Sequence, residues 1–324
     1  MRTRRLKQLF WVVLLLGTGQ QAGGLVVEYG EAPSWPLPAI SDSGTSTSWN
    51  FGQVAAVATS VNGDIVVLHR GADPIMVFDA DGRFIRSWGN GLFSNGKVVG
   101  IGGSERTEGR SRYTVVYGSA GCYACGAHSV RVDAVGNIWV VDAAGHVVYK
   151  MDDNGRVLME LGTRGTTGIS RNTFNLPTDV AFAPTGDVYV SDGYGNPRVV
   201  KYAADGQYLL EWGTRGIGPG EFGLPHNLVV DSRGRVYVTD RDNNRIQVFD
   251  SEGQFLAEWP NIGGVSSLFL TDEQRIWVGG VLRNLEGMML ARLFGTTGGH
   301  GTTVSRDGAV FVAQLDGRVQ KFLK

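Results

Sequence analysis

One pattern of hydrophobic and polar positions recurs six times along the chain. Each copy holds two short stretches in which apolar and polar residues alternate, joined by a turn rich in Gly, Asp and Asn. Such alternation is typical of antiparallel β-strands joined by tight turns. The copies read "AAVATSVNGDIVVLH", "HSVRVDAVGNIWVVD", "TDVAFAPTGDVYVSD", "HNLVVDSRGRVYVTD", "SSLFLTDEQRIWVGG" and "HGTTVSRDGAVFVAQ".

Further strands follow most copies, for example "VVKYAADGQYLLEWG" and "IQVFDSEGQFLAEW". Each unit then holds about four antiparallel strands in about 40 residues, which is the size of a propeller blade. The sequence predicts an all-β fold, a six-bladed β-propeller over residues 51–324, with the Trp-Gly pairs packing one blade on the next. The last copy is one strand short, and we expect "LVVEY", within an N-terminal closing strand and linker (23–50), to supply that strand and close the ring.

Composition narrows the classes of function. The chain of 324 residues has a net charge of −1 and contains 48 glycines. A near-neutral chain argues against nucleic acid as a partner, because that binding depends on lysine and arginine neutralising phosphates. The glycines suit an all-β chain with many tight turns.

Residues 1–22 have the layout of a signal peptide. Arg2, Arg4, Arg5 and Lys7 precede the apolar run "LFWVVLLLG", and cleavage is expected near Ala22. That run is shorter than the roughly 20 residues that span a bilayer. We therefore predict an exported protein, secreted or periplasmic, that is monomeric and has no stable membrane span after cleavage; an uncleaved N-terminal anchor is the alternative.

An extra stretch, residues 94–126, interrupts the rhythm of the repeats and leads directly into His128. Long loops in compact domains are often functional, so we expect a lid or a substrate-contacting loop at the histidine end of the ring; a surface excursion without a role is the alternative. The stretch holds both cysteines, Cys122 and Cys125. A local disulfide is favoured in an exported chain over a metal site with His128 or a redox motif.

Three histidines occupy the same position of alternate copies. His128, His226 and His300 open copies two, four and six, while Ala55, Thr178 and Ser266 hold that position in the others. In a closed ring of six blades, the three imidazoles would converge on one point with a fourth position open. Three histidines with one open position are the ligand set of a catalytic zinc.

A second set of reactive residues follows the second strand of the copies. Arg70, Tyr194 and Arg241 take these positions, which lie near the axis at the same end of a propeller. A tyrosine beside a metal can act as a general base, and an arginine can bind a substrate carboxylate in a bidentate manner. Packing at the rim of a blade is the alternative for each of them.

Other polar residues near these positions have structural interpretations. Asp142, Asp192 and Asp240 end their strands and are interpreted as residues that stabilise turns. His69 and His146 fall outside the register of the three histidines.

The repeats resemble NHL repeats, and the chain resembles the peptidyl-α-hydroxyglycine α-amidating lyase family over nearly the whole propeller. The marks are "VVLHRG", "HSVRVDAVGNIWVVD", "LPTDVAFAPTGDVYVSDGYGNPR" and "LPHNLVVDSRGRVYVTDRDNNRIQVF". The resemblance implies Zn²⁺ as cofactor, a catalytic tyrosine and two active-site arginines. The matching positions are His128, His226 and His300 for zinc, Tyr194 for the tyrosine, and Arg70 and Arg241 for the arginines.

The resemblance also implies a structural Ca²⁺ on the axis, bound by backbone carbonyls at the positions of Val57 and Val130. The position of its aspartate ligand is Gly301, which disfavours calcium because hard cations prefer carboxylate oxygens. Gly299 replaces a family proline, and Gly195 replaces a cysteine of a family disulfide.

These observations predict a zinc-dependent carbon–nitrogen lyase. Its substrate would be a small molecule or peptide ending in an α-hydroxyglycine-like group, cleaved to an amide and glyoxylate. Two alternatives come from other classes: an exported, non-catalytic NHL-repeat binding protein of the cell envelope, and a lactonase-like propeller hydrolase.

Overall fold

The computed structural model describes residues 26–33, 35–40, 46–101, 112–117, 123–296 and 298–324. The predicted signal peptide, 1–22, lies outside these residues. Within them, no helix has the length and apolar character needed to cross a membrane. The helical element found there is one 3-10 turn, η1 (Arg241–Asn243).

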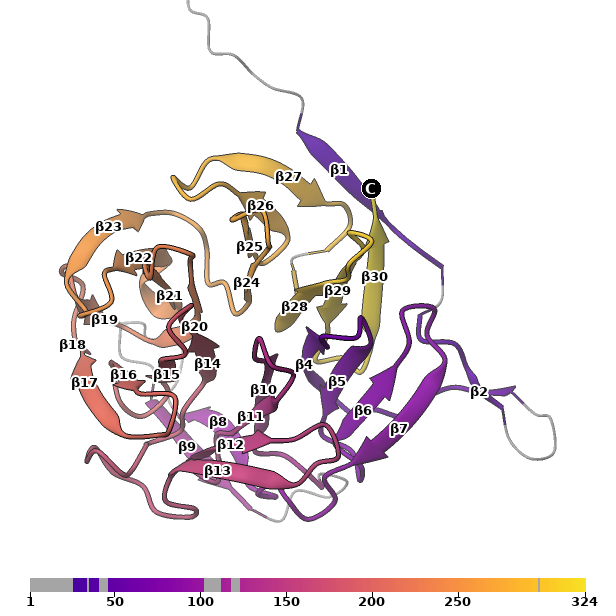
Figure 1. Cartoon of the computed structure of the whole chain (residues 1–324), viewed down its shortest axis with the longest axis horizontal. Coiled ribbons are helices and arrows are strands. Elements are labelled where there is room, and N and C mark those ends of the chain that lie inside the picture. Colours follow the sequence, from indigo (N-terminus) through magenta and orange to yellow (C-terminus); the bar gives the residue numbers. More distant parts are fainter. Residues whose placement is uncertain (1–25, 34, 41–45, 102–111, 118–122, 297) are drawn as a thin grey trace, which may run out of the picture.

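Six antiparallel sheets stand like blades around a central axis, which confirms the predicted propeller (Figure 1). From inner to outer strand, blade one is β4 (Val54–Thr59), β5 (Ile65–His69), β6 (Ile75–Phe78) and β7 (Phe84–Trp88); blade two is β10 (Ala127–Val132), β11 (Ile138–Asp142), β12 (Val147–Met151) and β13 (Val157–Gly162); blade three is β14 (Asp179–Phe182), β15 (Val188–Asp192), β16 (Arg198–Tyr202) and β17 (Tyr208–Trp212). Blade four is β20 (Pro225–Val230), β21 (Val236–Asp240), β22 (Arg245–Phe249) and β23 (Phe255–Trp259); blade five is β24 (Leu268–Leu270), β25 (Ile276–Val278), β26 (Val281–Arg283) and β27 (Met289–Leu293); blade six starts with β28 (Gly301–Val304), β29 (Val310–Ala313) and β30 (Val319–Leu323).

The ring is closed by the N-terminal strand β1 (Val27–Glu31), as predicted. β1 pairs antiparallel with β30 and so becomes the fourth strand of blade six. It also pairs in parallel with β27, which joins blades five and six into one eight-stranded sheet, and this second pairing was not predicted. Each innermost strand contacts the innermost strands of both neighbouring blades, so the inner ring is complete.

Apolar residues of adjacent blades fill the spaces between sheets. The tryptophans of the predicted Trp-Gly pairs pack on the next blade, as predicted. Trp88 of blade one lies against the β12–β13 turn of blade two, where a Cβ on Gly155 would be 2.4 Å from the indole. In the same way, Trp212 of blade three lies against Gly253 in the β22–β23 turn of blade four. Both glycines have a positive φ, so the turn and the packing each require glycine.

The segment predicted as linker contributes to the core. Trp35 is buried with its ring centroid 4.8 Å from that of Phe311 in blade six, and Trp49 packs edge-on against Phe78 of blade one. Two short strands, β2 (Ala39–Ile40) and β3 (Ser46–Thr47), also pair there. The segment therefore seals the junction between the last and the first blade.

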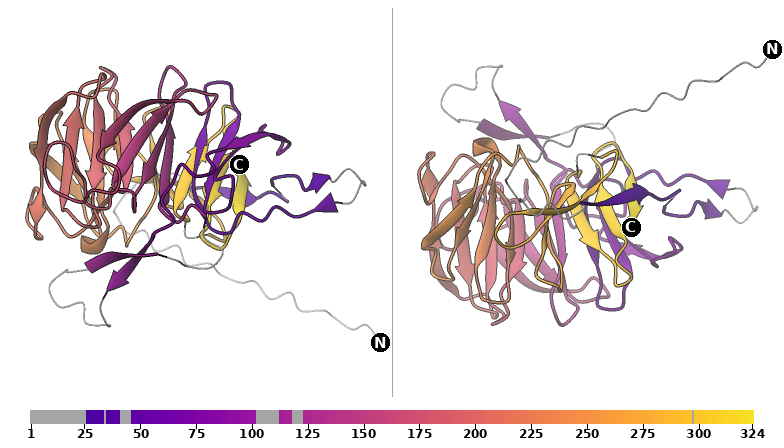
Figure 2. Two further views of the ribbon diagram at one scale, coloured as in Figure 1. Left: turned by 90° about the horizontal axis from the view of Figure 1, so that it is seen from below. Right: turned by 90° about the horizontal axis from the view of Figure 1, so that it is seen from above.

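The inserted stretch contains a hairpin of β8 (Lys97–Ile101) and β9 (Arg112–Val116) that protrudes from one face of the ring (Figure 2). A second small addition, β18 (Thr214–Arg215) with β19 (Glu221–Phe222), lies between blades three and four. These additions leave the ring of blades intact.

Candidate metal centre and active site

The structure brings His128, His226 and His300 together on the axis. Their ligand nitrogens all lie within 4.8 Å of one another, and the ring centroids are 4.8–5.3 Å apart. The ladders of β10 and β20 have an irregularity at the first two of these residues. A bulge re-aims a side chain, which explains how an inner-strand residue points along the channel.

Each imidazole uses its Nδ1 atom for a contact away from the shared centre. The Nδ1 acceptors are the Thr178 carbonyl at 2.5 Å for His128, the Asn227 Oδ1 atom at 2.7 Å for His226, and the Ala55 carbonyl at 2.7 Å for His300. An oxygen acceptor fixes the proton on Nδ1. The three Nε2 atoms are therefore left with lone pairs for the centre.

The electrostatics favour the neutral imidazole. Burial, with the nearby positive charges, holds the pKa of His128 and His226 well below the usual range. The pKa of His300 is lowered to about 4, mainly by burial. Neutral histidines with a fixed tautomer are competent metal ligands, so the residues fit zinc in composition, protonation and supporting contacts.

Tyr194 lies directly against this cluster. Its hydroxyl is 3.0 Å from Nε2 of His128 and 3.2 Å from Nε2 of His226. The residue follows β15, and its backbone N–H donates to the Leu176 carbonyl. The phenol oxygen is thus placed at the point on which the imidazoles converge.

Two arginines flank Tyr194. Arg70 donates through Nε to the Ala127 carbonyl at 3.2 Å and through Nη1 to Gln53. The guanidinium of Arg241 lies 5.5 Å from the centroid of the Tyr194 ring. Burial lowers the pKa of Arg70; burial also acts to lower that of Arg241, but the neighbouring phenols outweigh it and raise the pKa.

A further site residue, Tyr113, comes from the inserted hairpin. Its hydroxyl accepts a hydrogen bond from Nη2 of Arg241, and its ring centroid lies 4.5 Å from that of Tyr194. The insert therefore reaches the end of the ring where the histidines lie, as predicted. Its sequence position before His128 indicated this end, but no motif singled out Tyr113.

The remaining polar residues have structural contacts. The carboxylate of Asp142 accepts the backbone N–H groups of Ser94 and Gly145, in agreement with its interpretation as a turn residue. Asp192 and Asp240 cap neighbouring loops in the same way. His69 and His146 lie outside the cluster, and their Nδ1 atoms accept the backbone N–H groups of Gly71 and Leu176, respectively.

Cys125 is disulfide-bonded, which agrees with the preference for a local disulfide. Cys122, the other cysteine of the sequence, lies outside the described residues.

Calcium does not fit the axis. A Cβ at Gly301 would lie 2.8 Å from the Cα atom of Ala56, so the backbone leaves no room for an aspartate there. The carbonyls of Val57 and Val130 alone would offer no negative charge to a hard cation. Among the described residues, the histidine cluster is the one group of three or more His, Cys, Asp or Glu side chains arranged to hold a metal.

Comparison with known proteins agrees with the fold. The NHL repeat model matches residues 174–202 and 222–249. The chain is 28% identical over 299 residues to a probable peptidyl-alpha-hydroxyglycine alpha-amidating lyase of Caenorhabditis elegans, covering 83% of this chain and 81% of that protein. It is 32% identical over 170 residues to the peptidylglycine alpha-amidating monooxygenase of Rattus norvegicus, covering 50% of this chain but 16% of that protein.

Solved structures show the same architecture. The virginiamycin B lyase of Staphylococcus aureus superposes with a TM-score of 0.53 at 13% identity, covering 85% of this chain and 98% of that one. At that identity the likeness concerns the fold alone. The sequence relatives and the repeats together support a six-bladed NHL-repeat propeller that is similar to the peptidyl-α-hydroxyglycine α-amidating lyases.

Proposed function

We propose that the chain is a zinc-dependent lyase that cleaves the C–N bond of a peptidyl-α-hydroxyglycine-like carbinolamide. The products would be an amide and glyoxylate. The observation that carries this proposal is the convergence of three neutral imidazoles, through their Nε2 atoms, beside the hydroxyl of Tyr194. Relatives named as lyases of such substrates support it.

His128, His226 and His300 would hold the metal through Nε2. When bound, zinc supplies Lewis-acid polarisation of a substrate oxygen and a positive charge near it. The propeller contributes the fixed direction of the three rings, because each Nδ1 atom is already engaged. Little reorganisation is then needed when the metal binds.

Arg70 and Arg241 would bind the carboxylate of the α-hydroxyglycine. Both guanidinium groups lie near Tyr194 in a largely buried setting, where charge-assisted hydrogen bonds to a carboxylate are strong. Arg70 already uses Nε and Nη1 for protein contacts, so its Nη2 edge is the one left to face a ligand. The two arginines thus orient the substrate with its hydroxyl toward Tyr194.

Tyr194 would act as the general base. It takes the proton of the substrate hydroxyl while that C–O bond becomes the carbonyl of glyoxylate. The C–N bond breaks with its electron pair going to nitrogen, and the nitrogen takes up a proton to complete the amide. The proton lost from oxygen balances the proton gained by nitrogen, so the reaction needs no oxidant and no water.

The test is glyoxylate release from a short peptide ending in α-hydroxyglycine, with the metal content measured on the same sample. We expect one zinc per chain and release that stops with chelator and returns with zinc. Bound zinc without release would reject this substrate and retain the metal site. Absence of both would favour the non-catalytic binding protein.

A further inference from the structure

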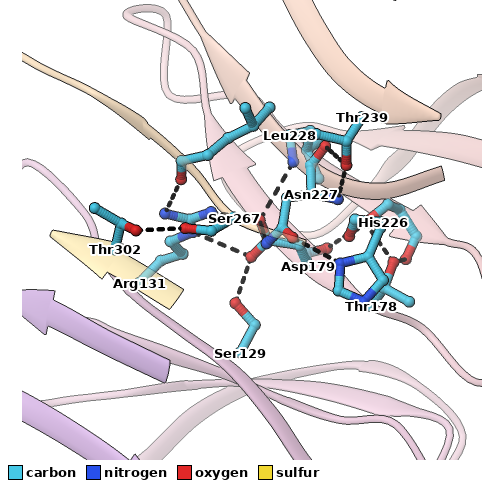
Figure 3. A network of polar contacts seen from close by, with 12 residues as sticks. Ser129, Arg131, Thr178, Asp179, His226, Asn227, Leu228, Thr239, Ser267 and Thr302 are labelled. Carbon is cyan, nitrogen blue, oxygen red and sulfur yellow. Dashed lines mark hydrogen bonds and ion pairs between the residues drawn. The ribbon is translucent and has the colours of Figure 1, made fainter. Parts of the chain in front are cut away.

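We propose that Asp179, paired with Arg131, is a positioning residue that sets the metal affinity of the histidine cluster through Asn227 and His226. The inference rests on the proposed metal site, but it concerns residues that no motif or relative assigns to that site. Asp179, on blade three, is fully buried, and its carboxylate accepts hydrogen bonds from residues of blades two and four (Figure 3).

The carboxylate of Asp179 is saturated with hydrogen-bond donors. Oδ1 accepts the hydroxyl of Ser129 and, at 3.1 Å, Nε of Arg131. Oδ2 accepts Nη2 of Arg131 at 2.5 Å, Nδ2 of Asn227 at 2.9 Å and the backbone N–H of Leu228 at 3.3 Å. Five donors on one buried carboxylate fix its orientation and that of each donor.

The contact with Asn227 decides how His226 is oriented. An amide side chain can present either its oxygen or its nitrogen to a neighbour. Because Nδ2 donates to Asp179, Oδ1 is turned toward His226 and accepts from its Nδ1 at 2.7 Å. The proton is therefore held on Nδ1, and Nε2 faces the cluster with its lone pair.

The residue before Asp179 supports a second histidine. The carbonyl of Thr178 is the Nδ1 acceptor of His128, and the Thr178 backbone N–H donates to Ser191 at 2.8 Å. Displacement of Asp179 would thus move the strand end that holds His128 as well. One dipeptide on blade three fixes the rings of two ligands, one on blade two and one on blade four.

Arg131 supplies the charge that lets the carboxylate stay buried. It starts on β10, reaches Asp179 on β14, and donates through Nη1 to the Leu268 carbonyl on β24 at 2.9 Å. It therefore ties blades two, three and five together across the centre of the ring. A buried carboxylate without such a partner would be costly to retain.

The decisive variants separate positioning from stability. Asn227→Leu removes the acceptor of His226 Nδ1. The paired change Arg131→Leu with Asp179→Leu removes both charges together, a replacement that is often neutral or stabilising for a buried ion pair. We expect each to weaken zinc binding about 10- to 100-fold, the usual cost of losing an outer-shell partner, with the paired variant remaining folded.

The matched control is Asp231→Leu with Arg235→Leu. This pair joins a fully buried carboxylate at the far end of β20 to an arginine at 2.6 Å, and it makes no contact with the histidines among the described residues. We expect it to alter thermal stability but leave the zinc affinity of the folded protein unchanged. Zinc affinity is measured by competition with a chelator, and stability by thermal unfolding of the metal-free chain.

A second readout needs no metal. The imidazole ¹⁵N shifts of His226 report its tautomer, and we expect the Nδ1–H form in the unchanged protein and a mixture in both decisive variants. Unchanged affinity and tautomer in these variants, or an equal loss of affinity in the control, would overturn the inference. If the unchanged protein binds no zinc, the proposed function fails, while the tautomer measurement still decides whether Asp179 positions His226.

Discussion

The two flanks of the histidine cluster are held by different means. On the polar flank, formed by blades two to four, His128 and His226 depend on buried polar groups that meet at Asp179. On the glycine flank, formed by blades six and one, the Nδ1 of His300 bonds to the Ala55 carbonyl with no such network behind it among the described residues. The same outcome, an imidazole aimed at the axis, is reached in two ways.

Close backbone packing replaces the network on the glycine flank. A Cβ at Gly299 would lie 2.3 Å from the Ala313 carbonyl oxygen, and one at Gly301 would lie 2.8 Å from the Cα atom of Ala56. The polar flank is thus sensitive to loss of a partner, whereas the glycine flank is sensitive to addition of a single carbon. This difference predicts opposite kinds of vulnerable substitution on the two sides of one site.

The largest effect is expected for Tyr194→Phe, because the change removes the proposed general base, whose hydroxyl lies against the two histidines of the polar flank. Removing a general base lowers kcat by about 10²–10⁴-fold. The rings of all three histidines keep their Nδ1 contacts, so zinc content should not change. Steady-state glyoxylate release and metal analysis on the same preparation check this, and loss of zinc together with activity would contradict the assigned role.

Asp179→Ala tests the polar flank for stability. The change leaves the Arg131 guanidinium without its carboxylate in a mostly buried place, and breaking such a pair costs about 3–5 kcal/mol. Urea unfolding of the metal-free protein measures this loss of stability. Asp316→Ala is the control, because its pair with Arg318 is exposed and should contribute about 0–1 kcal/mol; equal losses in the two variants would remove the distinction.

Gly301→Ala tests the glycine flank. The added methyl meets the backbone of Ala56, and overpacking of this kind costs about 1–3 kcal/mol. Gly30→Ala is the matched control, since a Cβ there meets nothing within 4 Å. Urea unfolding gives the free energy of unfolding of both variants. An unchanged value for Gly301→Ala would show that the backbone of the glycine flank can move to admit the methyl group.

A smaller effect is expected at the mouth of the site for Tyr113→Phe. The change removes the hydroxyl that accepts from Arg241 but retains the ring against Tyr194. One net hydrogen bond of about 1 kcal/mol corresponds to a rise in KM of roughly fivefold, with kcat retained. A fall in kcat without a change in KM would instead give Tyr113 a part in the chemical step.

The repeat pattern predicted the parts of the molecule that follow from local rules. Alternation and turn residues gave the blades, and the register of His128, His226 and His300 identified side chains that the structure brings within 4.8 Å. Tyr113 and Asp179 could not be found in this way. Tyr113 belongs to an insert outside the repeat, and Asp179 acts through a partner, Arg131, whose reach across the ring depends on three-dimensional packing.

The smallest effect is expected when calcium is added to the protein. This test concerns the axis of the ring, where the two flanks of the histidine cluster meet. The glycine flank excludes a carboxylate at position 301, and the polar flank already places the cation of Arg131 in the centre of the ring. A ligand present at 100 times its Kd stabilises the folded state by about 2.7 kcal/mol, so an excess of calcium would visibly raise Tm if a site existed. We expect no shift with calcium or with a calcium-selective chelator, in thermal unfolding of the zinc-loaded protein. A rise in Tm that disappears in Arg131→Leu with Asp179→Leu would mean that this carboxylate serves a metal ion rather than a guanidinium.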